Sequence, residues 1–79
     1  MDICHDRERQ RFVINLEADE AVLEYQWLSD SEVNFSRTYV PNRFRGQGYA
    51  EGLVKTGLAW ARGQQLHVEA SCWYVRDFL

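Results

Sequence analysis

The hydrophobic pattern of this chain changes its period once, at Pro41, and that change limits the folds open to it. Before Pro41, apolar and polar residues alternate in segments rich in β-branched and aromatic side chains, which is typical of half-buried strands. Short polar breaks separate these segments and predict hairpins. The predicted strands cover residues 12–16, 21–28 and 32–40. We therefore expect an antiparallel meander before Pro41.

Alternation also assigns side chains of the third predicted strand to two faces. It places Val33, Phe35 and Tyr39 on an apolar face and Thr38 on a wetter one. Arg37 falls on the apolar face, where it is the odd residue. We interpret it as a side chain that reaches past its apolar neighbours to water, or as an edge residue.

After Pro41 the apolar residues recur at helical spacing. They follow the i, i+3, i+4, i+7 rule from Ala50 to Ala61, which predicts an amphipathic helix, and Gly57 on its apolar stripe suggests a close approach to the sheet. An alternating run over 66–72 predicts a fourth strand, joined to the third by a right-handed helical crossover and therefore parallel to it. The tail from Trp73 to Leu79 suits a short helix or an extension. The predicted fold class is α+β.

Length restricts the chain to one domain. Its 79 residues can bury only one small core. Residues 1–10 are polar and lack a period, so we interpret them as an N-terminal arm on a single domain that covers 1–79. One predicted helix leaves the other face of the sheet open, so we expect the arm, the tail or a second copy of the chain to cover it. The expected oligomeric state is a monomer or a weak homodimer.

Charge and composition argue against several classes of partner. The formal net charge of −3 and one tight basic pair, Arg43 and Arg45, give too little positive surface for a nucleic acid. No apolar stretch approaches a membrane span, and the polar N-terminus lacks a signal-peptide core, so we expect a cytoplasmic protein that does not bind membranes. Cys4 and Cys72 are too few for a disulfide scaffold or for a zinc site made by protein ligands alone. We therefore expect that the chain binds no metal and that both thiols are free.

The segment from Val40 to Ala50 carries the most chemical information. It joins a strand end to a helix start through Gly46 and Gly48, and such a loop can direct backbone N–H groups toward an anion at the positive end of the helix dipole. Arg43 and Arg45 add charges suited to phosphate oxygens. A Walker A loop is excluded because no Gly-Lys pair follows Gly46 at the required spacing. A dinucleotide-binding loop needs several parallel strands, which an antiparallel meander does not supply.

A third phosphate-binding pattern, Arg/Gln-x-x-Gly-x-Gly/Ala, is satisfied in register by Arg43, Gly46 and Gly48. Three segments accompany it in the order Tyr39-Val40-Pro41, Arg45-Gly46-Gln47-Gly48-Tyr49-Ala50 and Cys72-Trp73-Tyr74-Val75. On these motifs the sequence resembles the GNAT superfamily of acetyl-coenzyme A-dependent N-acetyltransferases, and in particular its small, half-length members. The resemblance covers roughly residues 11–76.

The resemblance implies that acetyl-coenzyme A (acetyl-CoA) is the cofactor. Backbone N–H groups from Arg43 to Gly48 would hold its pyrophosphate. The third and fourth strands would splay apart, so that the pantetheine arm lies between them with Thr38 to Val40 along one side. The residues that the resemblance assigns to cofactor binding are Tyr39, Val40, Arg43, Phe44, Arg45, Gly46, Gln47, Gly48, Tyr49 and Ala50.

The resemblance also implies the chemistry at the end of the fourth strand. The thioester would arrive near Cys72, and Tyr74 is by position the candidate acid that protonates the departing thiolate. Cys72 has two interpretations, a small buried side chain or a nucleophile that takes the acetyl group and passes it on. Glu69 or His67 are candidate bases, although alternation places both on the face opposite Cys72. Trp73 stands where relatives often carry serine, so the wall around the cysteine is bulkier.

We therefore expect a minimal GNAT-like domain that binds acetyl-CoA and transfers acetyl to an amine of unspecified identity. The alternative is a non-catalytic module that binds coenzyme A or a partner protein through the same fold. Both hypotheses predict phosphate binding at Arg43 to Gly48. They separate at the thioester, because only the enzyme loses turnover when Cys72 or Tyr74 is replaced.

Overall fold

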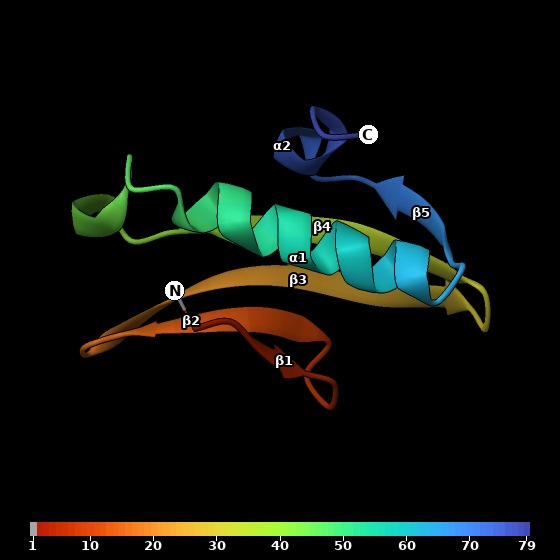
Figure 1. Ribbon diagram of the computed structural model, residues 1–79, viewed down its shortest axis with the longest axis horizontal. Helices are drawn as coiled ribbons and strands as arrows, with labels where there is room; N and C mark the ends of the chain where they lie inside the picture. Colours follow the sequence, from red (N-terminus) through yellow and green to blue (C-terminus); the bar gives the residue numbers. More distant parts are fainter. Residues whose placement is uncertain (1) are drawn as a thin grey trace.

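The computed structural model describes residues 2–79 and contains one mixed sheet of five strands with a long helix on one face (Figure 1). The strands, in their order across the sheet, are β1 (Cys4–Asp6), β2 (Arg11–Leu16), β3 (Asp19–Ser29), β4 (Glu32–Tyr39) and β5 (His67–Ala70). A short 3₁₀ helix η1 (Asn42–Phe44) precedes α1 (Tyr49–Gly63), and the chain closes with α2 (Trp73–Arg76). Strands β1 to β4 are antiparallel to their neighbours and β5 is parallel to β4. The predicted α+β class, meander and parallel crossover are confirmed.

The N-terminal segment differs from the expected polar arm. Cys4–Asp6 form β1, an edge strand that pairs with β2. His5 stacks on Phe12 with 4.1 Å between ring centroids, and its Nε2 lies 2.8 Å from the hydroxyl of Tyr25. Polar composition concealed this strand, because its central side chain is an imidazole that packs inward. Residue 1 of the expected arm lies outside the described residues.

The core lies between the sheet and α1. Gly57 permits the close contact of these two layers, because a Cβ at this position would lie 2.7 Å from Leu23 Cδ2 and 3.1 Å from Phe35 Cε1. The close approach predicted from Gly57 is thereby confirmed. The largest side chains that are fully buried are Phe12, Phe35, Leu23, Leu53, Val33, Val54 and Val75. The last of these belongs to α2, which anchors the C-terminal tail to the same core.

A shift of register in β4 changes which of its residues face α1. The pairing with β3 moves by one residue at Ser36, which is left as an extra residue in β4. Simple alternation predicted Arg37 on the apolar face and Thr38 on the wetter one, and both assignments are wrong beyond this bulge. Arg37 pairs with Glu24 on the far side of the sheet at 3.3 Å, and Thr38 lines a cavity beside α1.

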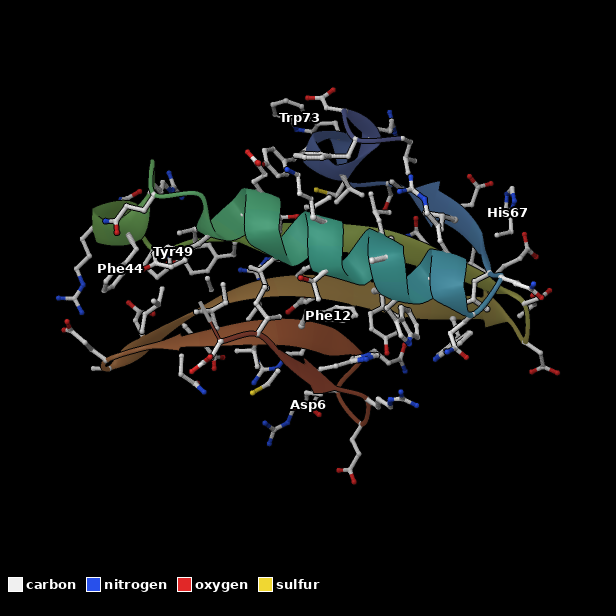
Figure 2. All side chains as sticks on the ribbon, viewed as in Figure 1. Asp6, Phe12, Phe44, Tyr49, His67 and Trp73 are labelled. Carbon is white, nitrogen blue, oxygen red and sulfur yellow. The ribbon has the colours of Figure 1, made fainter. Side chains whose placement is uncertain are left out.

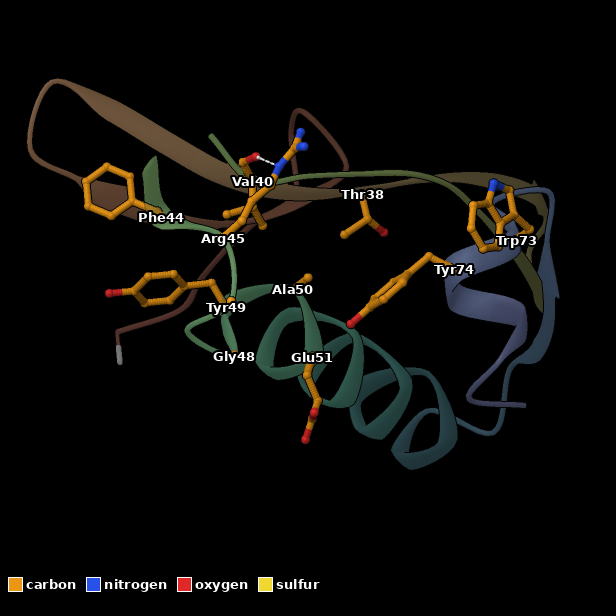
Figure 3. A pocket seen from close by; sticks show the side chains of 11 residues that line it. Thr38, Val40, Phe44, Arg45, Gly48, Tyr49, Ala50, Glu51, Trp73 and Tyr74 are labelled. Atoms are coloured by element: carbon orange, nitrogen blue, oxygen red, sulfur yellow. Dashed lines mark hydrogen bonds between the residues drawn. The ribbon is translucent and has the colours of Figure 1, made fainter. Parts of the chain in front are cut away.

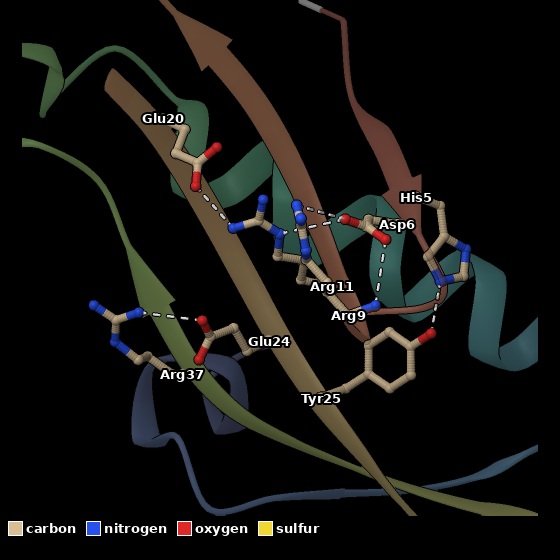
Figure 4. A network of polar contacts seen from close by, with 8 residues as sticks. All are labelled: His5, Asp6, Arg9, Arg11, Glu20, Glu24, Tyr25 and Arg37. Carbon is tan, nitrogen blue, oxygen red and sulfur yellow. Dashed lines mark hydrogen bonds and ion pairs between the residues drawn. The ribbon is translucent and has the colours of Figure 1, made fainter. Parts of the chain in front are cut away.

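The far face of the sheet carries ion pairs in place of a covering helix (Figure 4). Arg11 Nη1 lies 2.7 Å from Glu20 Oε1, and Arg11 Nε lies 3.7 Å from Asp6 Oδ2. Arg37 and Glu24 form a further pair on the same face. Antiparallel sheets can present such a polar face to water. No helix among residues 2–79 is long and apolar enough to cross a membrane.

Candidate functional site

A cavity of about 680 Å³ opens between the end of β4, the loop that follows it, the start of α1, and α2 (Figure 3). Its lining comes from four short pieces of chain that are distant in sequence. These residues are Thr38, Val40, Phe44, Arg45, Gly46, Gly48, Tyr49, Ala50, Glu51, Trp73 and Tyr74. The loop that carries the predicted phosphate motif and the α2 residues after Cys72 therefore meet at one site.

Strands β4 and β5 separate beside this cavity. Their pairing extends as far as Phe35 and Ala70, after which the N–H of Cys72 donates to the carbonyl of Phe35 at 3.1 Å. Asn34 fastens the end of β5, because its Oδ1 accepts from Ser71 N at 2.9 Å and its Nδ2 donates to Ser71 Oγ at 3.0 Å. Beyond this clamp, no other strand among residues 2–79 pairs with the β5 side of β4. This edge of β4 is open because β5 ends at Ala70, whereas the resemblance implied two strands that splay apart.

The loop before α1 has the geometry of an anion site. Gly46 and Gly48 have φ values of +80° and +84°, and a Cβ built at either position would meet nothing within 4 Å. Gly48 is the N-cap of α1 and has no side chain to cap it, and the N–H of Gly52 donates to its carbonyl at 3.0 Å. The N–H groups of Tyr49–Glu51 therefore have no partner within the helix, and they lie at the positive end of its dipole.

The two loop arginines are held in different ways. Arg45 lines the cavity, and its Nε donates to the carbonyl of Val40 at 2.9 Å. Arg43 lies outside the lining, with its Nη2 3.5 Å from Glu17 Oε2 and its Cζ 4.8 Å from the centre of the Phe44 ring. The Arg43–Glu17 pair is largely exposed and is therefore weak. Arg45 is fixed to the main chain, whereas Arg43 can exchange its partner at little cost.

Cys72 adjoins the cavity at the start of α2. Its Sγ lies 3.6 Å from Thr38 Oγ1. Partial burial raises the pKa of this thiol, but the main-chain N–H of Val75, the Thr38 hydroxyl, and the N–H groups of Tyr74 and Thr38 outweigh that effect, so the pKa is lowered overall. The surroundings therefore stabilise the thiolate relative to that of an ordinary cysteine.

Helix α2 presents Tyr74 and Trp73 to the end of the cavity that is remote from Phe44 (Figure 3). Burial raises the pKa of Tyr74, and the negative charges of Glu51 and Asp77 raise it further. The phenol is therefore protonated at neutral pH and can act as a proton donor. The indole of Trp73 lines the cavity and is nevertheless 74% exposed, which is unusual for a tryptophan.

Most of the predicted site residues come together in this structure. The cavity lining contains Val40, Phe44, Arg45, Gly46, Gly48, Tyr49, Ala50 and Tyr74. Arg43 and Gln47 lie in the same loop without lining the cavity, and Cys72 touches it through Thr38. The prediction of Tyr39 on the apolar face is wrong, because the bulge at Ser36 turns its ring to the far face, where Arg37 Cζ lies 5.2 Å from its centre. Only the main chain of Tyr39 belongs to the free edge of β4.

Glu51 was missed as a site residue, and the two candidate bases lie elsewhere. Glu51 stands in the first turn of α1, and its position two residues after Tyr49 was the available signal. His67 Nε2 lies 3.5 Å from Glu69 Oε1, and both side chains are more than half exposed on β5. Neither lines the cavity, and Figure 2 shows His67 at the opposite end of the molecule from Phe44.

Comparisons with known proteins identify relatives of this chain in sequence and in structure. A family model described as GCN5-related N-acetyl-transferase matches residues 11–79. The protein NATD1 of Bos taurus is 35% identical over 77 residues, which cover 95% of this chain and 68% of the relative. NATD1 of Xenopus tropicalis is 34% identical over 77 residues, which cover 95% of this chain and 71% of the relative. The solution structure of a GCN5-like candidate N-acetyltransferase from Staphylococcus aureus has a TM-score of 0.76 and 26% identity, and the match covers 98% of this chain and 76% of the other.

Proposed function

Because the chain belongs to the GCN5-related N-acetyltransferase family, we propose that it binds acetyl-CoA in the cavity beside α1 and transfers the acetyl group to an amine. The observation that carries this proposal is the glycine loop. Two glycines with positive φ lead directly into unpaired N–H groups at the start of a helix of 15 residues. Acetyl-CoA supplies an acetyl group that is already activated as a thioester.

The residues around the cavity suit the parts of this ligand. The N–H groups of Tyr49–Glu51 and the open space over Gly46 and Gly48 suit a pyrophosphate, and Arg45 adds a positive charge on the same wall. The free edge of β4 from Thr38 to Val40 offers main-chain groups for the amides of a pantetheine arm. The reactive end of the ligand then falls near α2.

Tyr74 is the proposed acid at that end. Its raised pKa keeps the hydroxyl protonated at neutral pH, and its ring projects between α1 and β4 (Figure 3). Cys72 lies beside it with a lowered pKa, and we propose that its sulfur either contacts the thioester or accepts the acetyl group before the amine does. His67 and Glu69 have no part in this proposal, because neither lines the cavity.

Steady-state assays with acetyl-CoA and a panel of small amines, polyamines and lysine peptides test the proposal. Tyr74→Phe is expected to lower kcat about 10²-fold or more, with the affinity for coenzyme A unchanged, because it removes only the proton donor. Cys72→Ala is expected to lower turnover, while Cys4→Ala, which removes the other thiol, is expected to leave turnover unchanged.

The outcome for each variant separates an enzyme from a binding module. Turnover that persists in both Tyr74→Phe and Cys72→Ala would overturn the roles proposed for these residues. Tight binding of coenzyme A without transfer to any amine would instead support the non-catalytic module that shares this fold.

A further inference from the structure

We infer that Asn34 is a positioning residue, which holds one extra residue at the end of β5 and thereby turns Cys72 and Tyr74 toward the cavity. The inference rests on the proposed function, because these two residues are the groups proposed to act at the thioester. Asn34 itself does not line the cavity. Its side chain lies on the far face of the sheet, since its neighbours Val33 and Phe35 are fully buried in the core beside α1.

The extra residue is evident from the main-chain hydrogen bonds between the two strands. The N–H of His67 donates to the carbonyl of Ser31 at 2.8 Å, and the N–H of Cys72 donates to the carbonyl of Phe35 at 3.1 Å. Between these two bonds the segment through β4 advances by four residues, from 31 to 35, whereas the segment through β5 advances by five, from 67 to 72. In a regular parallel ladder both strands advance equally, so one residue of the second segment is left over.

Asn34 supplies the hydrogen bonds that the extra residue, Ser71, would otherwise lack. Pairing is in register as far as Ala70. In that register the N–H of Ser71 would donate to the carbonyl of Phe35, but Cys72 takes this acceptor. The carboxamide of Asn34 replaces it, because its Oδ1 accepts from Ser71 N at 2.9 Å and its Nδ2 donates to Ser71 Oγ at 3.0 Å. Without the carboxamide, the simplest repair is the regular register, with Ser71 bonded to the carbonyl of Phe35.

The extra residue decides which side chain faces the cavity. Because Ser71 is held to the far face, the next side chain turns toward α1, where Cys72 Sγ lies 3.6 Å from Thr38 Oγ1. A slip of one residue exchanges the two faces of a strand, so the regular register would put Ser71 in the place of Cys72. Tyr74, two residues further along, would be displaced as well. Bulges can re-aim side chains beside active sites, and Asn34 is the residue that keeps this one in place.

Alkylation of Cys72 by iodoacetamide tests the inference without any ligand. In a Cys4→Ser background, Asn34→Leu keeps the approximate size of the side chain but removes both hydrogen bonds to Ser71. The midpoint of the alkylation rate is therefore expected to move to higher pH, as the sulfur leaves Thr38. Asn34→Thr, which suits a strand but is too short to span the gap to Ser71, is expected to give the same shift.

Gln26→Leu is the matched control. Gln26 Nε2 donates to Ser36 Oγ at 3.2 Å, so the same kind of bond joins β3 to β4 and leaves β5 out. Its loss is expected to leave the alkylation midpoint of Cys72 unchanged.

Turnover provides the second readout. Asn34→Leu is expected to lower kcat by about 10²-fold with the KM for acetyl-CoA little changed, because a displacement of about 1 Å at the reacting groups can cost this much and the glycine loop is untouched. Asn34→Asp is expected to restore most of kcat, since its carboxylate can accept from both the N–H and the hydroxyl of Ser71.

An unmoved midpoint in Asn34→Leu and Asn34→Thr would overturn the inference and leave the proposed cofactor site intact. An equal shift in Gln26→Leu would overturn it as well, as would an Asn34→Asp variant that is as impaired as Asn34→Leu. Absence of turnover in the folded wild type would instead overturn the proposed function, while a midpoint shifted only by the Asn34 variants would still show that Asn34 places Cys72.

Discussion

The two ends of the layer between the sheet and α1 are built in opposite ways. Near the end of α1, an aromatic cluster of His5, Phe12, Tyr25 and Trp60 packs tightly, with ring centroids 4.1 Å apart for His5 and Phe12 and 5.0 Å apart for Tyr25 and Trp60. Near its start, β4 and β5 separate, the helix has no side-chain cap, and a cavity of about 680 Å³ lies open. Stacked aromatic rings are therefore concentrated at one end and unpaired main-chain groups at the other.

This division explains how so short a chain can keep an open site. Unpaired N–H groups and an uncovered strand edge add little stability, because they exchange hydrogen bonds with water in the absence of a ligand. The aromatic cluster adds stability at the end remote from the cavity, where none of its rings lines the cavity wall. We call the end with the aromatic cluster the closed end and the end with the cavity the open end. Substitutions at the closed end should therefore change stability, whereas substitutions at the open end should change ligand binding.

Truncation at the closed end should have the largest effect. Phe12 is 1% exposed and contacts His5 and Trp60, so Phe12→Ala is expected to lower the free energy of unfolding by about 3–5 kcal/mol. Phe44→Ala at the open end, where the ring lines a cavity, is expected to lose less than half as much. Urea denaturation, monitored by tryptophan fluorescence, measures the free energy of unfolding of both variants. Equal losses would contradict the division between the two ends.

A pair of glycines in α1 sharpens the same comparison. Gly57→Ala forces a methyl group against Leu23 and Phe35, so it is expected to destabilise the fold by about 1–3 kcal/mol despite the better helix propensity of alanine. Gly63→Ala, where a Cβ would meet nothing within 4 Å, is expected to be neutral or slightly stabilising. Thermal unfolding followed by circular dichroism gives both values. A Gly57→Ala variant as stable as Gly63→Ala would show that the two layers do not pack closely.

At the open end, the predicted effect is on reactivity. The pKa of Cys72 is lowered although burial opposes the change, and the Thr38 hydroxyl is one of the groups responsible. In a Cys4→Ser background, the rate of alkylation by iodoacetamide should rise with pH around a midpoint below that of an ordinary thiol. Thr38→Val is expected to move this midpoint upward, while Thr56→Val, on the exposed side of α1, should not. An unmoved midpoint in Thr38→Val would remove Thr38 from the account of this thiol.

The smallest predicted effect is a dependence of stability on pH at the closed end. Burial lowers the pKa of His5, Arg7 lowers it further and Asp6 opposes the change. The unfolded chain therefore binds the proton of the His5 imidazole more tightly than the folded chain does. The free energy of unfolding of the protein should fall as the pH drops below about 6.5. Above that pH, the neutral imidazole makes its full contribution to stability. Denaturation midpoints between about pH 5 and 7.5 should fall less in His5→Gln than in the wild type. Identical pH profiles would show that His5 does not titrate differently in the folded state.

Features that depend on local sequence were predictable. The spacing of Gly46 and Gly48 and the apolar period of α1 lie within one continuous segment, and both predict what the structure contains. The parallel fourth strand follows from the same helix, since a crossover of this kind returns the chain to the sheet in one direction.

Features that depend on contacts between residues distant in sequence were not predictable. Strand β1 pairs with β2, and its His5 bonds to the hydroxyl of Tyr25, twenty residues away. A histidine in a polar segment gives no sign of such partners. The extra residue at Ser36 reverses the faces of Arg37 and Thr38, and nothing in the alternation marks where a bulge interrupts the register. Glu51 forms part of a cavity wall only together with distant residues such as Trp73 and Tyr74 of α2.

The most direct test of the glycine loop as a phosphate site is calorimetric titration of coenzyme A into the wild type, Gly46→Glu and Gly46→Asn. Asparagine tolerates the positive φ of this position and carries no charge, so it separates backbone strain from electrostatic repulsion. We expect affinity on the order of micromolar in the wild type, a modest loss in Gly46→Asn and no detectable binding in Gly46→Glu. A folded wild type that gives no heat with coenzyme A, or a Gly46→Glu variant that binds as tightly as Gly46→Asn, would contradict a phosphate site at the start of α1.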